Sequence, residues 1–158
     1  MRKKPFNAPI GVRWECLRCS KCCGDTSNKK RRILLLSSEA KQIKEAISTP
    51  IIKFCRRTGF QPFIHEMKKP SGKCFFLKNN QCQIYSLRPL VCRFYPFWLE
   101  KDENNFSFKV TDECTGVSSG HVLGGAFFYD LFNLANNRIN MRMDTVTGLP
   151  VESLDHAN

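Results

Sequence analysis

The segment Cys16–Cys23 reads Cys-Leu-Arg-Cys-Ser-Lys-Cys-Cys and places four sulfur atoms within eight residues. Two intervening residues allow successive cysteines to converge on one ion at about 2.3 Å. Three sulfurs at CxxCxxC spacing also match the beginning of a ferredoxin-type 4Fe-4S motif. The final pair, Cys22 and Cys23, is harder to accommodate because neighbouring side chains usually diverge. The motif therefore predicts a metal centre, with Cys23 either a ligand of a second metal or a thiol outside the site.

Four further cysteines, Cys74, Cys82, Cys92 and Cys114, raise the number of possible ligands to eight. Eight thiolates would complete two tetrahedral sites. The ninth cysteine, Cys55, has no partner at chelating distance along the chain and is expected to be a small buried hydrophobic residue. The predicted metal ligands are therefore Cys16, Cys19, Cys22, Cys23, Cys74, Cys82, Cys92 and Cys114.

The redox state of the cellular compartment determines whether clustered cysteines form disulfides or bind metal. Met1–Trp14 is basic but lacks the apolar run of a secretory signal, and the longest strictly aliphatic run, Ile33–Leu36, is much too short to cross a bilayer. We therefore expect a cytoplasmic protein without membrane association, in which clustered cysteines hold metal in preference to forming disulfides. Soft thiolates select iron-sulfur clusters or zinc. The CxxCxxC spacing favours a 4Fe-4S cluster, with two structural zinc sites as the close alternative.

Short strands are predicted from apolar runs and turn signals. Ile33–Leu36 is expected to be a buried strand, and the paired residues Asn79-Asn80 tolerate the left-handed conformations of a tight hairpin turn. This hairpin would place Cys74 and Cys82 near its open ends. Residues 97–100 and 106–110 flank a polar stretch and predict a second hairpin.

Two principal helices and one short helix complete the prediction. The first helix spans about 39–47, with Ser37 or Ser38 as its N-cap. A short helix that carries Cys92 must stop before Pro96. The last helix is expected over 121–139, started by Ser118 or Ser119, with a core stripe of Leu123, Phe127, Leu131 and Leu134.

These elements predict a small α+β, cysteine-rich domain that is stapled by metal. Its expected organisation is a flexible basic arm over residues 1–13, the metal-binding domain over 14–140, and a loose tail over 141–158. A chain of this length is most simply one domain with a real core.

The formal net charge is +11, and it is distributed unevenly. Residues 1–32 carry ten Lys or Arg against two acids, whereas residues 111–158 carry two against six. Such asymmetry can mark an RNA or acidic-protein surface. A solvated, soluble face explains the same charge without a partner, so nucleic-acid binding is possible but not favoured.

The cysteines and their surroundings resemble a known family. The motif at 16–23, Cys74, the run Cys82–Pro96 and Cys114-Thr-Gly116 are similar to the YkgJ-type CxxCxxCC family of zinc- or iron-chelating proteins. The resemblance implies a compact zinc- or iron-sulfur-binding domain, similar to the cysteine region of flagellin lysine N-methylases. Ser20 stands where the family often has glycine, and the glycine spacing after Cys114 is irregular. The first departure affects the turn of the loop and not its ligands.

Arg88 and Arg93 lie in the segment of this chain that matches the family almost continuously. Clustered thiolates leave negative charge, and guanidinium groups supply donors that do not titrate. We expect at least one of the two arginines to donate to a ligating sulfur or to a neighbouring carbonyl, and thus to support cofactor binding without being a ligand.

The favoured function is an iron-sulfur module that acts as an accessory or electron-transfer partner of another protein. The alternatives are a structural zinc domain with two sites of four cysteines each, a protein-modifying enzyme similar to a lysine methyltransferase, and a basic RNA-binding zinc module. No S-adenosylmethionine site is recognisable, and no residue is nominated as the base for a cysteine nucleophile. The sequence leaves enzymatic activity undecided.

Overall fold

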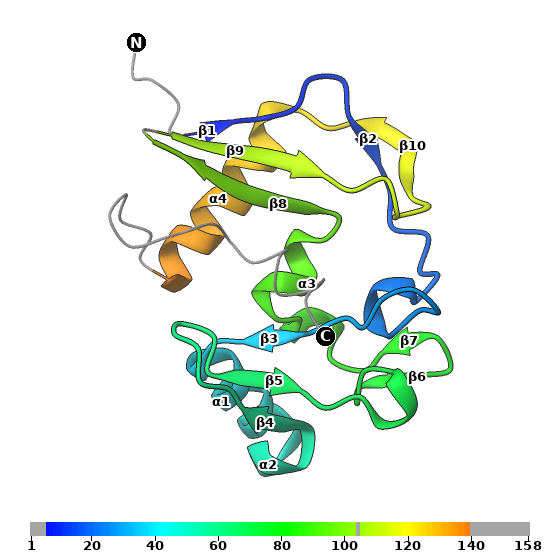
Figure 1. Cartoon of the computed structure of the whole chain (residues 1–158), viewed down its shortest axis with the longest axis vertical. Helices are drawn as coiled ribbons and strands as arrows, with labels where there is room; N and C mark the ends of the chain where they lie inside the picture. The colour runs from blue at the N-terminus through cyan, green and yellow to red at the C-terminus, as the bar shows by residue number, and fades with distance from the viewer. Residues whose placement is uncertain (1–5, 104, 140–158) are drawn as a thin grey trace. The chain divides into compact units, whose positions relative to one another are not determined.

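A computed structural model describes residues 6–103 and 105–139 (Figure 1). Its short strands and four helices, two of them long, confirm the predicted α+β class for the part of the chain that is described. The described backbone divides into two compact units, one that combines residues 6–17 with the described residues of 94–139, and one formed by Arg18–Arg93. No helix among the described residues is both long and apolar enough to cross a membrane. The predicted tail over 141–158 lies outside the described residues.

The first unit contains a three-stranded sheet in the order β1-β9-β8. The hairpin predicted from the sequence is confirmed, because β8 (Phe97–Asp102) pairs antiparallel with β9 (Asn105–Val110). Strand β1 (Phe6–Asn7) pairs parallel with β9 and buries Phe6, so part of the predicted arm belongs to this sheet. A second, two-stranded sheet joins β2 (Arg13–Trp14) to β10 (Val117–Val122).

The last helix, α4, covers one face of the β8–β9 hairpin in this unit (Figure 1). It begins at Gly125 and ends at Ile139, so the predicted start near residue 121 is wrong. Residues before the helix belong to β10, where Ser118 and Gly120 have φ values of 75° and 78° that no α-helix tolerates. The chain therefore pairs with β2 before it turns into the helix.

The core stripe of α4 is also corrected. The buried residues are Phe128, Leu131, Phe132 and Ala135, whereas the sequence predicted a stripe through Leu123, Phe127, Leu131 and Leu134. The phase is set by the sheet: Phe128 packs on Phe108 and Phe132 packs on Phe106, with ring centroids 5.1 and 5.7 Å apart. Trp14 packs edge-on against Phe97 at 5.9 Å in the same aromatic layer.

The second unit is built around a small antiparallel sheet in the order β3-β5-β4. Strand β3 (Leu34–Leu35) confirms the predicted buried strand, and it pairs with β5 (His65–Met67), which pairs in turn with β4 (Cys55–Arg57). Helix α1 (Ser37–Ile47) confirms the predicted helix but starts earlier, with Leu36 as its N-cap in place of a serine. The short helix α2 (Ile51–Phe54) follows it.

The rest of this unit carries most of the cysteines. Strands β6 (Leu77–Lys78) and β7 (Gln81–Cys82) form the predicted hairpin, whose turn residues Asn79 and Asn80 have φ values of 51° and 58°. Helix α3 (Leu90–Phe94) carries Cys92 and ends before Pro96, as predicted. Three 3-10 turns complete the described structure: η1 (Lys21–Cys23), η2 (Pro70–Gly72) and η3 (Tyr85–Leu87).

Candidate metal centre

The part of the cysteine motif that lies in the second unit forms a tight turn. Arg18 and Ser20 have φ values of 51° and 64°, in the left-handed region that favours glycine. The amide of Cys23 donates to the carbonyl of Ser20 at 3.1 Å and closes η1. The hydroxyl of Ser20 donates to the carbonyl of Asn80 at 3.3 Å, which offsets part of the cost of a side chain in this conformation. Serine at position 20 is therefore compatible with the turn.

The adjacent thiols of Cys22 and Cys23 lie close together. Their sulfur atoms are 3.9 Å apart, although neighbouring side chains were expected to diverge. The 3-10 conformation of η1 permits this approach. Two thiolates bound to one tetrahedral ion with bonds of about 2.3 Å would lie about 3.8 Å apart. The pair therefore has the spacing that two ligands of a single ion require.

Cys74 is joined to this turn by the backbone. Its amide donates to the carbonyl of Cys23 at 2.6 Å, and Gly24 forms a single antiparallel bridge with Lys73. A β-carbon on Gly24 would lie 2.9 Å from the carbonyl oxygen of Gly72, closer than side chains are found to approach backbone. Glycine at position 24 is thus what lets the segments carrying Cys23 and Cys74 lie side by side.

Cys82 belongs to the hairpin that follows. The amide of Leu77 donates to the carbonyl of Cys74 at 2.9 Å, and Leu77 is the cross-strand partner of Cys82. The sequence predicted Cys74 and Cys82 near the open ends of this hairpin, and the pairing places Cys82 within its strand β7. Both cysteines are partly buried.

Cys92 is positioned through helix α3 by a residue that the sequence did not nominate. Glu39 is only 3% exposed, and its carboxylate accepts hydrogen bonds from the amide of Leu90 at 2.7 Å and from the amide of Leu36 at 3.0 Å. One buried carboxylate therefore caps the first turns of both α1 and α3, whose amides lack partners within their helices. A glutamate at the third position of a helix is a capping-box signal that could have identified the contact with Leu36. The contact with Leu90 has no signal in the sequence.

The thiols of this unit influence one another's ionisation. Burial is the largest cause that raises the pKa of Cys74, Cys82 and Cys92, and neighbouring sulfurs of the same group raise each of them further. For Cys22 the hydrogen bond with the Cys23 thiol is the largest cause of the raised pKa, followed by burial. These thiols are therefore protonated at neutral pH without a cation, and a metal ion that binds them must displace protons.

Cys16 and Cys114 both lie in the first unit. The amide of Glu15 donates to the carbonyl of Gly116 at 3.1 Å, which places the segments that carry the two cysteines next to each other. A β-carbon on Gly116 would lie 2.0 Å from the carbonyl oxygen of Glu15. Glycine is therefore required for this strand pairing, as it is at position 24 in the second unit.

The donor set fits zinc or an iron-sulfur cluster in its chemistry, and the 3.9 Å between the Cys22 and Cys23 sulfurs fits two ligands of one ion. Thiolates are the ligands that both groups prefer. Within the described residues, however, no three His, Cys, Asp or Glu side chains already converge on a common point. Movement of side chains about the connected backbone segments would be needed to complete a coordination sphere. Cys16 and Cys19 are exposed.

Cys55 is the cysteine that the sequence excluded from the site. It is 1% exposed in β4, and burial, followed by the nearby Cys74, raises its pKa to about 12. These properties fit a small hydrophobic residue of the core. Of the three histidines, His65 lies in β5 and His121 in β10, and His156 lies outside the described residues.

The two arginines predicted to support the site contact backbone carbonyls between Cys82 and Cys92. Arg88 donates through Nε to the carbonyl of Tyr85 at 2.9 Å. Arg93 donates to the carbonyl of Arg88 at 3.0 Å and to the carbonyl of Ser86 at 2.6 Å. The Arg88 guanidinium also lies 3.8 Å from the centre of the Tyr85 ring. Contacts to neighbouring carbonyls are one of the two arrangements expected from the sequence, and the effect of the arginines on metal affinity stays a prediction.

Fold and thiols together define a small α+β domain of the metal-chelating, cysteine-rich class. A family model described as "CxxCxxCC: Putative zinc- or iron-chelating domain" matches residues 15–115, more than half of the chain. The chain belongs to this family, as its cysteine pattern indicated.

Its similarity to individual proteins is more distant. The uncharacterized protein MJ0661 of Methanocaldococcus jannaschii is 30% identical over 89 residues, which make up 55% of this chain and 46% of the relative. The chain thus spans about half the length of the curated relative that it matches. No solved structure matches it.

Proposed function

We propose that this chain holds an iron-sulfur cluster of the 4Fe-4S type through its clustered cysteines, and that it serves another protein as an accessory or electron-transfer module. The observation that supports this most directly is the hydrogen bond of 2.6 Å from the amide of Cys74 to the carbonyl of Cys23. It joins the CxxCxxCC loop to the hairpin that carries Cys82. A bound cluster would supply one-electron redox chemistry, which needs no catalytic base from the protein.

The protein's own residues would bind and orient the group. The proposed ligands from the second unit are Cys19, Cys22, Cys74, Cys82 and Cys92, together with Cys23 if two groups are held. Each buried thiol would give up a proton on binding. The positive charge of Arg88 favours ionisation of Cys82, against the larger effect of burial. Cys16 and Cys114, which belong to the first unit, stay ligands predicted from the sequence.

Structural zinc is the second candidate, and one distance favours it. The Cys22 and Cys23 sulfurs are 3.9 Å apart, close to the spacing of about 3.8 Å for two thiolates on one tetrahedral ion. Zinc would make the chain a metal-stapled interaction domain without redox activity. A reducing cytoplasm is the compartment we propose in either case, because all nine cysteines are free thiols.

Anaerobic purification followed by metal and sulfide analysis separates the two candidates. A brown protein with broad visible absorption and equal iron and sulfide would support the cluster. A colourless protein with zinc would replace the cluster by zinc and retain the cysteine site. A protein that binds neither under reducing conditions would contradict both.

Serine variants identify the ligands. Replacing Cys19, Cys22, Cys74, Cys82 or Cys92 should lower the metal content, because a ligand is lost. It should also lower the stability, because folding is coupled to metal binding. Cys55→Ala is the matched control, since it removes a buried sulfur of the same unit and should leave metal stoichiometry unchanged. Equal metal loss in this control would refute the ligand assignment.

A further inference from the structure

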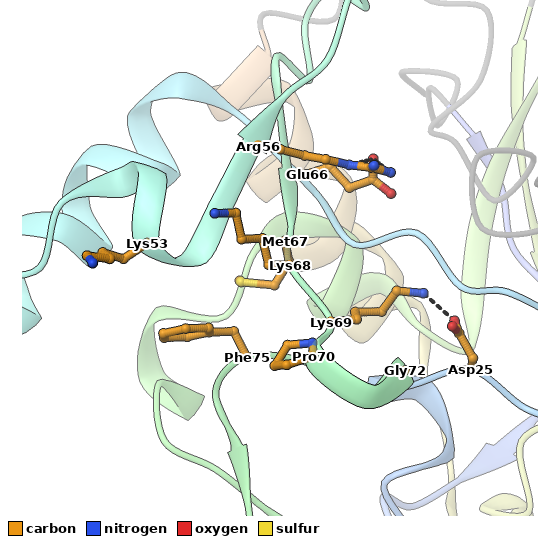
Figure 2. A pocket seen from close by; sticks show the side chains of 10 residues that line it. All are labelled: Asp25, Lys53, Arg56, Glu66, Met67, Lys68, Lys69, Pro70, Gly72 and Phe75. Carbon is orange, nitrogen blue, oxygen red and sulfur yellow. Dashed lines mark hydrogen bonds and ion pairs between the residues drawn. The ribbon is translucent and has the colours of Figure 1, made fainter.

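A pocket of about 510 Å³ opens on the second unit and has no cysteine among its lining residues (Figure 2). It lies between helix α2, strand β5 and the segment around η2. Pockets of this volume are typical of small-molecule sites. No sequence pattern indicated it, because its walls come from four separate stretches of chain.

Basic groups dominate the lining. Lys53, Arg56, Lys68 and Lys69 supply four positive charges and Asp25 and Glu66 supply two negative ones, which leaves a net charge of +2. Lys69 forms an ion pair with Asp25, drawn as a dashed line in Figure 2. Both acids are thus engaged within the wall, since Glu66 pairs with Arg32 and Arg56, and the lining keeps an excess of positive charge.

The donors of three basic groups are not exhausted. Lys68 donates to the carbonyl of Ile52 at 2.5 Å, which leaves two of its three ammonium hydrogens. Arg56 uses Nε and Nη2 on Glu66, at 3.1 and 2.8 Å, and retains the other hydrogens of its guanidinium. The side chain of Lys53 makes no hydrogen bond or ion pair with the described residues.

An aromatic surface lies beside these donors. The amide of Phe75 donates to the carbonyl of Lys68 at 3.0 Å, and the Phe75 ring lies 6.4 Å from that of Phe54, the residue after Lys53. Lys53, Lys68 and the ring of Phe75 therefore belong to one end of the pocket, as Figure 2 also shows. Met67 and Pro70 add apolar surface.

We propose that this pocket binds a small phosphate monoester that carries a planar group, with the phosphate at Lys53 and Lys68 and the planar group on Phe75. A phosphate monoester carries a charge of about −1.5 to −2 at neutral pH, which complements the net +2 of the lining. Lysine and arginine are the usual donors to phosphate oxygens. None of the proposed contacts is a cysteine, although Phe75 directly follows Cys74 in the chain.

The test is isothermal titration of the metal-loaded protein with three probes: adenosine 5′-monophosphate, adenosine and inorganic phosphate. Adenosine 5′-monophosphate should bind more tightly than either fragment. Lys53→Gln should weaken its binding about tenfold or more, since a charge-assisted hydrogen bond is lost. Phe75→Leu should weaken binding of the nucleotide and leave binding of inorganic phosphate unchanged.

Lys41→Gln is the control, because it removes one exposed lysine of α1 that does not line the pocket. It should bind like the wild type. Equal weakening by Lys41→Gln and Lys53→Gln would reveal general attraction to the basic surface and would overturn the proposal. Absence of nucleotide binding, or binding that neither Lys53→Gln nor Phe75→Leu alters, would overturn it as well. Far-UV circular dichroism of each variant establishes that it is folded before titration.

Discussion

The buried carboxylate of Glu39 provides the sharpest test of how the second unit is held together. It accepts hydrogen bonds at 2.7 and 3.0 Å from the first amides of two helices, and one of these helices carries Cys92. In Glu39→Gln the remaining carbonyl oxygen can accept one of these bonds, while the new amide group faces the other backbone donor. A hydrogen bond to a charged group contributes about 1.5 to 3 kcal/mol. Losing one and weakening the other should lower the free energy of unfolding by about 2 to 4 kcal/mol.

The assay is urea denaturation followed by far-UV circular dichroism, on the protein as purified. Glu45→Gln is the matched control, because it neutralises an exposed glutamate of the same helix and should stay within about 0.5 kcal/mol of the wild type. Glu39→Gln should also weaken metal binding, since the start of α3 would lose its anchor. A Glu39→Gln variant as stable as Glu45→Gln would refute the idea that this carboxylate couples the two helices.

Three further results are expected. Gly24→Ala should reduce the metal content, because the new β-carbon would lie 2.9 Å from a backbone oxygen. Metal analysis should show no reduction in Gly59→Ala, whose β-carbon would have no neighbour within 4 Å. Burial opposes ionisation of Glu66, but hydrogen bonds from two arginines outweigh it and lower its pKa below 4.5. The ion pairs of Glu66 therefore stabilise the fold above that pH, and this stabilisation is lost as the pH falls through the lowered pKa. Glu66→Gln should lower the free energy of unfolding by about 1 to 3 kcal/mol at neutral pH and leave it unchanged in strong acid, as measured by urea denaturation at each pH. Arg88→Gln or Arg93→Gln should weaken metal affinity by about 10- to 100-fold; wild-type affinity in both variants would mark these arginines as surface charge.

Local signals predicted much of the fold. Paired asparagines at 79 and 80 indicated the β6–β7 turn because their backbone preference is intrinsic to the residues. The predicted start of α4 was wrong because the residues up to Val122 belong to β10. This strand forms by pairing with Arg13–Trp14, more than a hundred residues earlier in the chain. The predicted start rested on an apolar stripe that begins at Leu123, and the pair Gly124-Gly125 inside the predicted helix was the available signal that the helix begins later.

The spacing of the cysteines nominated the residues of the candidate site but not their arrangement in the fold. Spacing identified the cysteines, since chelation imposes short intervals on ligands that share an ion. It could not show that Cys16 and Cys114 belong to one compact unit and Cys19 to the other. The sequence did not indicate that Glu39 joins the two helices, because one of its hydrogen-bond donors, the amide of Leu90, lies 51 residues away in the chain.

The aromatic packing of Trp14 gives the two units separate optical signals. Both tryptophans, Trp14 and Trp98, belong to the first unit, and the span Arg18–Arg93 contains none. Trp14 packs edge-on against Phe97, so its emission should change when that layer separates. Intrinsic fluorescence would then report melting of the first unit alone, while circular dichroism would report both. Coincident thermal curves would mean that the two units unfold cooperatively, and separated curves would give each unit its own transition temperature.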